Sequence, residues 1–514
     1  MKNILKTIML ILFVGFAACD DFIEVDPIGP DADDYFNSEA EYESALIGAY
    51  DLLQASFWNV LTGVVASDDY AAGGDTFTED QPTLQNVNRM THSPADENQL
   101  RDIWNLMYAG INRTNYLLEF KNKTEFDGKD EIIAQAYFLR AYYTFELVKF
   151  FGNVPLKVQE RDGVNRIADS RVVIGEQFNI NRTENISEAY SLIEEDLKEA
   201  ILNLPVTQDE VYKVTLGAAQ ALLGKVYLYH GTYDSAKFAD AATMLNNVIG
   251  TQYSLTTGTD YLDLFESSME NSSESVFEIQ YTGVEGAGWD CITCSEGSYF
   301  VQFCGPRSPY DNPVYRTGWG FCLPSQELYD MFDDGDSRRE VTFYDLRDEQ
   351  DSYSPGRDDT GFFNKKYMPR KADERVGANP LNHANNYRSI RYADVLLMAA
   401  EAEVKSVGVN AIDYLNQVRA RAYGDNSHDY MASEGDLLEA IYTERRKELA
   451  GEGHRFFDLV RTGKAMEAFD AYNAIRPADA AINFTIDKNE LFPIPLIELE
   501  LANAVTRWGQ NQGY

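Results

Sequence analysis

The chain has 514 residues, 44% of them apolar, and its 83 Asp and Glu against 44 Lys and Arg give a formal net charge of −39. That charge argues against nucleic acid and other polyanionic partners, because like charges repel. The length allows a large core in two to four domains or in one extended repeat architecture, and composition does not choose between them.

The first 21 residues have the pattern of a lipoprotein leader. Lys2 and Lys6 precede an apolar run from Ile8 to Phe16, two alanines follow, and Cys19 comes next. The run is too short for a permanent membrane helix, and cleavage would leave the cysteine as the new first residue. We therefore predict a signal peptide over residues 1–18 and lipidation of Cys19, which would anchor the protein to a membrane surface. An ordinary secretory signal with an incidental cysteine is the alternative.

Most of the remaining chain has apolar residues at intervals of 3 and 4, the pattern of amphipathic helices. Helix stops are visible at Gly152 with Pro155, and at Pro205. No later apolar run reaches the roughly 20 residues of a membrane helix, so a soluble body is expected after Cys19. The segments with the helical pattern are Glu39–Gln54, Gln99–Phe120, Glu131–Phe151, Ile186–Leu204, Ser389–Ser406, Ala411–Arg421 and Gly435–Leu449.

One segment, Thr215–Asn247, has the spacing of a tetratricopeptide repeat. Its leucine, close-packing glycine, tyrosine and small residues fall at Leu223, Gly224, Tyr227, Gly231 and Ala236. This predicts two antiparallel helices with a tight turn near Gly231. One such hairpin cannot bury its apolar face alone, so other helices must stack on it.

Between Tyr253 and Asn386 the helical period fades, and Gly, Ser, Asp, Tyr and Trp dominate. An irregular stretch of this length inside a domain is uncommon unless it is functional or disordered, and its aromatic residues favour order. Four cysteines fall within it: Cys291, Cys294, Cys304 and Cys322. Local disulfides, free thiols and a zinc site are all open, whereas a redox pair is disfavoured because the surrounding glycines indicate a loop.

Several long motifs follow one another from Cys19 to the last residue: Cys19–Pro27, Ala134–Leu156, the repeat in Thr215–Asn247, Gly318–Arg339, Arg391–Glu403, Tyr414–Ala422, Glu444–Gly463, Leu491–Pro495 and Gln510–Tyr514. Together they resemble the SusD/RagB family of nutrient-binding outer-membrane lipoproteins. The charged residues within them are expected to form ion pairs and caps of the scaffold, namely Arg140, Arg391, Asp394, Glu401, Glu444, Arg445, Arg455 and Asp458.

The resemblance implies a mostly α fold, with about four tetratricopeptide-like helix pairs and a long irregular ligand-binding insertion. Residues 19–514 would form one domain, with helical repeats mainly in 39–252 and 389–463 and the insertion at about 253–386. It also implies a protein on the exterior of the outer membrane that binds oligosaccharide and serves as the lid of a SusC-like TonB-dependent transporter. A peptide ligand, as in RagB-like branches, is the alternative.

A glycoside hydrolase in the same fold is the competing class. With 83 acidic residues, carboxylate pairs such as Asp68 and Asp69 occur by chance and carry no weight without geometry. The five histidines form no H-E-x-x-H motif, and the sequence has neither a G-x-S-x-G elbow nor a P-loop. We therefore predict no enzyme, no cofactor and no metal site.

Sugars are bound by aromatic faces together with fixed polar groups, and two segments have that composition: Ala66–Asn88 and Trp289–Tyr315. The resemblance places ligand contacts in these regions but fixes no single position. Trp319, in a Gly-Trp-Gly motif, is expected to be scaffold. The candidate ligand-binding residues are Trp289, Asp290, Tyr299, Tyr310, Asp68, Asp69 and Tyr70.

Overall fold

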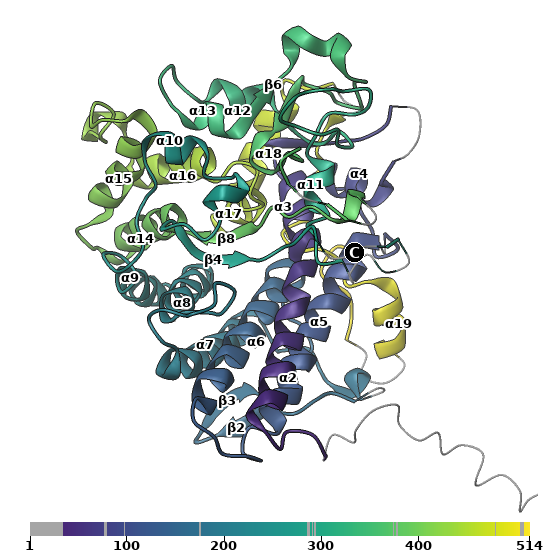
Figure 1. Cartoon of the computed structure of the whole chain (residues 1–514), viewed down its shortest axis with the longest axis vertical. Helices are drawn as coiled ribbons and strands as arrows, with labels where there is room; N and C mark the ends of the chain where they lie inside the picture. Colours follow the sequence, from purple (N-terminus) through teal and green to yellow (C-terminus); the bar gives the residue numbers. More distant parts are fainter. Residues whose placement is uncertain are drawn as a thin grey trace, which may run out of the picture.

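The computed structural model describes residues 34–514 except 77–79, 97, 174–175, 285–287, 290, 292–294, 374, 377–378, 478–479 and 504–507. The predicted leader and Cys19 lie outside the described residues. The described chain is mostly helical, which confirms the predicted fold class (Figure 1). Within these ranges, no helix combines the length and apolar character needed to cross a membrane.

The helices are α2 (Glu39–Asp51), α3 (Phe57–Val65), α4 (Pro82–Asn88), α5 (Asn98–Glu119), α6 (Lys129–Phe151), α7 (Ile186–Asn203), α8 (Leu216–His230), α9 (Lys237–Asn246), α10 (Gly258–Leu262), α11 (Phe300–Phe303), α12 (Gln326–Asp330), α13 (Arg338–Thr342), α14 (Tyr392–Ser406), α15 (Ala411–Tyr423), α16 (Leu437–Glu448), α17 (Arg455–Arg461), α18 (Ala465–Asn473) and α19 (Leu496–Asn503). The strands are β1 (Tyr70–Gly73), β2 (Val158–Arg161), β3 (Val164–Ile167), β4 (Ser275–Ile279), β5 (Phe321–Pro324), β6 (Phe343–Asp345), β7 (Phe362–Asn364) and β8 (Tyr387–Arg391).

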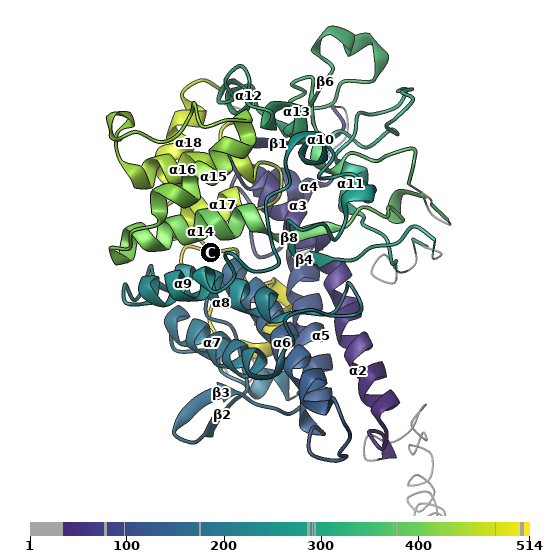
Figure 2. The ribbon, with the colours of Figure 1, turned by 60° about the vertical axis from the view of Figure 1, so that its left-hand side comes forward.

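The helices stack in a row in which each packs on the next. Helix α2 lies on α5, and α5, α6, α7, α8 and α9 follow in sequence order. Helix α9 then packs on α14, although the whole insertion separates them in the chain (Figure 2). The row continues with α15 and α16 against α14. The insertion therefore leaves and re-enters a continuous helical scaffold without interrupting it.

The hairpin of α8 and α9 has the predicted tetratricopeptide geometry. Thr215 caps α8 by accepting a hydrogen bond from a backbone N–H of the first turn. A Cβ at Gly224 would lie 2.5 Å from the Leu245 side chain, and one at Gly231 would lie 2.4 Å from the Phe238 ring. Only glycine allows the two helices to approach so closely, which explains the spacing seen in the sequence.

The insertion is held to the scaffold by short antiparallel strand pairs. Strand β4 pairs with β8 directly before α14, and β5 pairs with β1 near the amino end of the chain. In the second pair Tyr70 lies opposite Pro324, and Gly73 lies opposite Phe321. The pairing brings residues about 250 positions apart onto one ladder beside α3.

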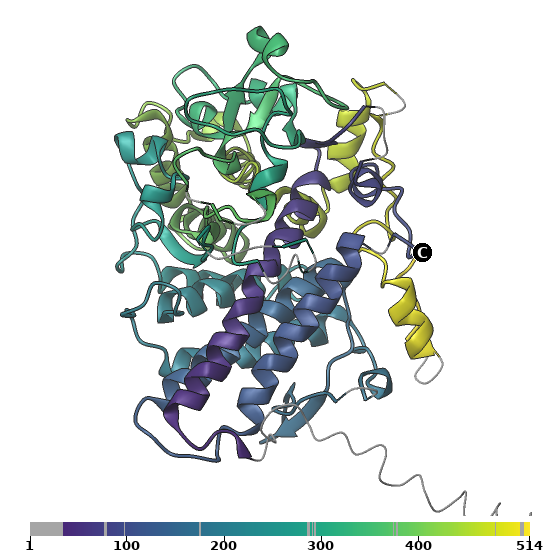
Figure 3. The ribbon, with the colours of Figure 1, turned by 45° about the vertical axis from the view of Figure 1, so that its right-hand side comes forward.

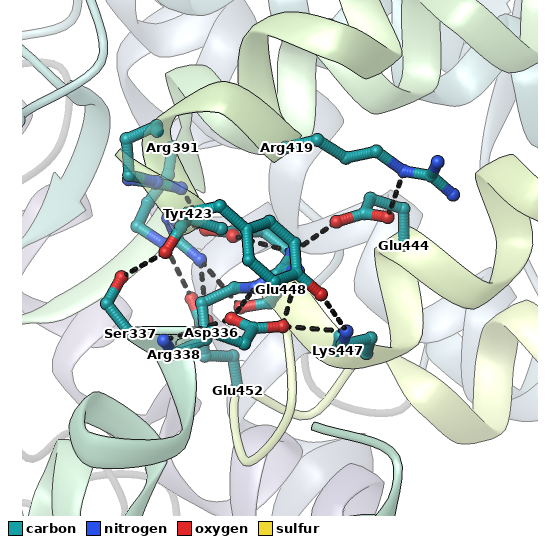
Figure 4. A network of polar contacts seen from close by, with 12 residues as sticks. Asp336, Ser337, Arg338, Arg391, Arg419, Tyr423, Glu444, Lys447, Glu448 and Glu452 are labelled. Atoms are coloured by element: carbon teal, nitrogen blue, oxygen red, sulfur yellow. Dashed lines mark hydrogen bonds and ion pairs between the residues drawn. The ribbon is translucent and has the colours of Figure 1, made fainter. Parts of the chain in front are cut away.

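A buried network of charged side chains joins the insertion to α14, α15 and α16 (Figure 4). Arg391 donates to Glu448 (2.9 Å), Glu452 (2.7 Å) and Glu274 (2.7 Å), and Arg421 donates to Glu274 and Glu448. These five side chains are at most 1% exposed. Burial opposes the ionised form of Glu448, but the neighbouring arginines outweigh it and lower the pKa of this carboxyl. The expectation that the motif residues are scaffold is confirmed here for Arg391.

Removing the charge of Glu448 should strongly destabilise the fold. The Glu448→Gln variant leaves Arg391 and Arg421 buried without one of the two carboxylates that they share, a defect that costs about 3–5 kcal/mol. Urea unfolding followed by circular dichroism measures the loss. The matched control is Asp334→Asn, because Asp334 pairs with Arg339 at a fully exposed position and should leave the midpoint unchanged. Equal midpoints for the two variants would contradict a stabilising role for the network.

Candidate functional site

A continuous group of aromatic rings runs from α3 to the surface of the insertion; we call Trp58, Tyr299, Phe303, Trp319 and Trp289 the aromatic wall. Trp58 packs on Tyr299 at 5.7 Å between ring centroids, and Phe303 packs on Trp319 at 5.3 Å. Trp289 stacks on Trp319 at 6.2 Å with 17° between the ring planes. Tyr299 meets both of these rings edge-on, at 6.1 Å and 5.5 Å. The wall thus ends in two nearly parallel indoles, Trp289 and Trp319, and the buried ring of Tyr299 packs against the edges of both.

Exposure differs sharply along this wall. Trp289 is 53% exposed, Trp319 is half-buried, and Tyr299 is only 4% exposed. Of the two aromatic residues predicted as a pair, Trp289 therefore offers a ring face to solvent, while Tyr299 supports it from the interior.

Glycines fix the position of Trp319. The residue lies between Gly318 and Gly320, and its backbone N–H donates to the Gln302 carbonyl at 2.9 Å. A Cβ at Gly318 would lie 2.4 Å from the backbone of Gly305, and Gly320 has a positive φ of 67°. The Gly-Trp-Gly motif is thus required for the close approach of two backbone segments, which holds the indole in one place.

Arg307 connects the two segments whose composition predicts sugar binding, Ala66–Asn88 and Trp289–Tyr315. Its guanidinium donates to Asp75 at 2.9 Å and to the carbonyl of Trp319 at 3.0 Å, and it pairs with Asp80 at 3.6 Å. Asp75 belongs to the first predicted segment and Arg307 to the second. The structure therefore brings the two segments together beside the exposed end of the aromatic wall.

Asp68 and Asp69 lie at the opposite end of β1, in a buried ion cluster. Arg455 donates to both carboxylate oxygens of Asp68 (2.8 and 2.9 Å), and Arg446 donates to Asp69 at 2.8 Å. Burial disfavours the Asp68 carboxylate, but Arg455 and Arg446 outweigh it and lower its pKa; for Asp69, burial dominates and raises the pKa. The pair ties β1 to α16 and α17.

Two further predicted ligand-binding residues, Tyr70 and Tyr310, are not members of the aromatic wall. Tyr70 is 2% exposed, and its hydroxyl is buried without a hydrogen-bond partner in the described chain. Tyr310 is half-buried and donates its hydroxyl to Tyr344 at 2.9 Å. Asp290 lies outside the described residues.

The cysteines take two different states. Cys291 is disulfide-bonded, while Cys304 and Cys322 are free and buried; Cys294 lies outside the described residues. Burial raises the pKa of the Cys304 thiol, and contact with Cys322 adds to the shift. The described residues contain no group of three or more His, Cys, Asp or Glu that could hold a metal ion.

Two features of this site are not predicted from the sequence. Trp319 is expected to be scaffold, which stays a prediction; that it is the direct stacking partner of the exposed Trp289 has no signal in the sequence. Arg307 and Asp75 are 232 positions apart in the sequence, and no local sequence pattern predicts their ion pair. In the sequence, only Gly318 and Gly320 point to the fixed position of Trp319, because glycines mark places where backbone segments pack closely.

Comparison with known proteins identifies the family. A model of the SusD family matches residues 341–514, and a model described as starch-binding associating with outer membrane matches residues 21–228. A solved laminarin binding SusD-like protein is 35% identical, with a TM-score of 0.79 over 93% of this chain and 100% of that one. The chain belongs to the SusD family.

Two further relatives are similar over nearly the whole chain. Surface glycan-binding protein A from Bacteroides thetaiotaomicron, solved in complex with laminarihexaose, is 26% identical, with a TM-score of 0.78 over 92% of this chain and 99% of that one. SusD-like protein P2 of Formosa agariphila is 28% identical over 96% of this chain and 97% of its own length. Resemblance therefore extends across both the scaffold and the insertion.

Substitutions in the aromatic wall should separate support from exposure. Tyr299→Ala removes a buried ring that packs on both indoles, and such a change costs about 3–5 kcal/mol. Trp289→Ala removes a half-exposed ring and should leave the melting temperature within a few degrees of the parent. Differential scanning calorimetry measures both. A Trp289→Ala variant as unstable as Tyr299→Ala would show that the outer indole belongs to the core.

Proposed function

We propose that this protein is a non-enzymatic surface lipoprotein that binds oligosaccharide at the exposed end of the aromatic wall and delivers it to a SusC-like TonB-dependent transporter. The observation that carries the proposal is the pair of nearly parallel indoles, Trp289 and Trp319, with one ring face open to solvent. An indole face fits the apolar C–H face of a sugar ring, and a fixed ring loses little entropy on binding.

The charges beside the wall favour a neutral glycan. Arg307 is held by Asp75 and Asp80, so the guanidinium and the two carboxylates place opposite charges within a few ångströms of each other. Such a group can exchange hydrogen bonds with sugar hydroxyls without demanding an anionic ligand. The laminarin binding relative and the laminarihexaose complex support a laminarin-type glucan as the first ligand to test.

The state of the carboxylates near the wall supports binding without catalysis. Glycoside hydrolysis needs two carboxyl groups facing a sugar, one of them available to protonate the leaving group. Asp75 and Asp80 both pair with Arg307, and Asp68 and Asp69 are engaged by Arg455 and Arg446. These pairings support a binding protein over the hydrolase alternative.

Removing the outer indole should weaken glycan binding. Trp289→Ala loses a stacking contact of about 1.4 kcal/mol, which corresponds to a roughly tenfold weaker affinity for laminarihexaose by isothermal titration calorimetry. The matched control is Tyr233→Ala, which removes a 57% exposed ring on the turn between α8 and α9 and should bind as the parent does. Unchanged affinity in Trp289→Ala would move the site away from the wall. Affinity for peptides and for no glycan would favour the peptide-binding alternative.

Two kinds of support bear on membrane anchoring and on the transporter partner: the leader sequence and the family to which the chain belongs. The lipoprotein pattern at residues 1–18 and Cys19 supports attachment to the membrane, and the matching family model is described as associating with the outer membrane. A lid over a wide barrel requires a contact larger than the roughly 1,200–2,000 Å² of a standard interface.

Lipid attachment at Cys19 and transporter binding can be tested together in the native membrane. Cys19→Ala should release the protein into the soluble fraction after carbonate washing, with its helical circular dichroism unchanged. The parent protein, extracted in mild detergent, should co-purify with a large TonB-dependent barrel. A variant that stays on the membrane would contradict lipidation at this residue, and a parent recovered only as a free lipoprotein would contradict the partnership.

A further inference from the structure

A serine, a histidine and a glutamate form a hydrogen-bonded chain between α7 and α8. The Oγ atom of Ser187 lies 2.6 Å from Nε2 of His230, and Nδ1 of the same ring lies 2.5 Å from Oε1 of Glu194. Ser187 and Glu194 are seven residues apart on α7, so they share one face of that helix, and His230 is the last residue of α8. The three groups stand in the order of a nucleophile, its base and the carboxylate that orients the base.

The carboxylate decides which nitrogen of the imidazole carries the proton. Glu194 is buried, and its other oxygen accepts a hydrogen bond from Nζ of Lys237 at 2.6 Å. Burial opposes the ionised form of Glu194, but the hydrogen bonds from His230 and Lys237 outweigh it and lower the pKa of this carboxyl. An ionised carboxylate only accepts hydrogen bonds, so in the neutral imidazole Nδ1 carries the proton and Nε2 presents its lone pair to Ser187.

Packing holds the imidazole in this orientation. His230 is 2% exposed, and its ring stacks on the ring of Tyr190 with 5.6 Å between the centroids and 29° between the planes. Tyr190 is itself buried and follows Ser187 by one turn of α7. Ser187, by contrast, is only half-buried. The hydroxyl therefore meets solvent, while the base that contacts it is screened from solvent.

Ser187 is also placed where negative charge is stabilised. It is the second residue of α7, and the first N–H groups of a helix have no acceptor within the helix. The side chain of Asn185 accepts the N–H of Glu188, and Ile186 and Ser187 supply the N–H groups before it. A carbonyl oxygen attacked by the serine gains negative charge, which the positive end of a helix and its N–H groups stabilise.

The surroundings of Ser187 favour a neutral reactant. Glu184 and Glu188 flank it in the sequence, and the Glu188 carboxylate accepts the backbone N–H of Glu184 at 2.6 Å. Like charges repel, so acyl phosphates and other anionic donors are disfavoured. Tyr233 is 57% exposed and packs on Tyr190 with 6.0 Å between the ring centroids, which adds an apolar surface beside the chain of hydrogen bonds.

We propose that Ser187 is a modification site that accepts an acyl group from a neutral activated ester. The Oγ atom attacks the ester carbonyl carbon, and its proton passes to Nε2 of His230. The bond from that carbon to the leaving oxygen then breaks, and the leaving oxygen takes the proton from Nε2. The products are an O-acylserine and an alcohol, with no change of oxidation state.

The acyl group should remain on the serine. Its hydrolysis requires a water molecule at Nε2 of His230, from which the imidazole could take a proton. Because His230 is buried, the site provides little access for that water. Ser187 is therefore modified once and does not turn over an ester.

The modification is independent of the proposed glycan binding. Ser187, Glu194 and His230 belong to α7 and α8, which pack on each other in the helical row, and none of them is a member of the aromatic wall. Figure 3 shows most of the insertion, in green, above the blue helices of this row. Failure of one proposal therefore leaves the other standing.

Acylation with p-nitrophenyl acetate tests the site in the intact protein. The parent should release a burst of nitrophenolate equal to the amount of protein and then stop, and mass spectrometry of its peptides should place the acetyl group on Ser187. Ser187→Ala should abolish the burst. The matched control is Ser191→Ala, because Ser191 is an exposed serine one turn further along α7 whose hydroxyl donates to a backbone carbonyl at 3.0 Å, and this variant should react as the parent does.

Removal of the base separates activation from mere exposure of the serine. His230→Asn should slow acetylation about a hundredfold or more, the usual contribution of a positioned base. Circular dichroism and laminarihexaose affinity, expected to equal those of the parent, verify that each variant is folded. If His230→Asn does not fold, the map of acetylated residues in the parent still decides. Absence of a burst in the parent, acetyl groups spread over several serines, or equal rates in His230→Asn and the parent would overturn the proposal.

Discussion

The buried cluster around Arg391 and Glu448 is the constraint on which the arrangement of the chain depends. Ions taken out of water lose hydration worth several kcal/mol each, and only complete pairing compensates for that loss. Arg391 comes from the end of β8, Glu448 from α16, and Glu274 from the residue before β4. The cluster is therefore complete only when the insertion, α14 and α16 occupy their native positions, which makes it a test of correct assembly as much as a source of stability.

The position of the aromatic wall, the proposed binding face, is fixed by this scaffold. Strand β4 leads from the cluster into the insertion, and the β1–β5 pair returns to α3, where Trp58 supports the aromatic wall. At the near end of β1, Asp69 is fixed by Arg446 of α16; at the far end, Asp75 is fixed by Arg307. An exposed ring such as Trp289 is thus supported by groups whose positions are determined deep in the fold.

The scaffold could be predicted from the sequence because its signals are local. Gly224 and Gly231 stand at the offsets where two neighbouring helices must touch, and the apolar spacing of α5 to α9 is visible within single helices. The site could be predicted only as two segments. The contact of Arg307 with Asp75 spans 232 positions and that of Arg446 with Asp69 spans 377, and such pairs are set by tertiary packing. Composition selected Trp289 and Tyr299 equally, but exposure separates a ring available to a ligand from one that supports it.

The distribution of charge in the sequence is uneven. Residues 101–182 contain 12 Lys and Arg against 11 Asp and Glu, so the excess of negative charge lies in the rest of the chain, which includes every residue of the aromatic wall. Like charges repel, and the surroundings of the wall therefore disfavour polyanionic ligands. Under the proposed function, this leaves neutral glycans as the ligands that stacking on Trp289 can select. The wall is joined to the helical row through α3, which packs on α5, so the ring that the proposal assigns to the ligand is supported by the same scaffold that the buried ions hold together.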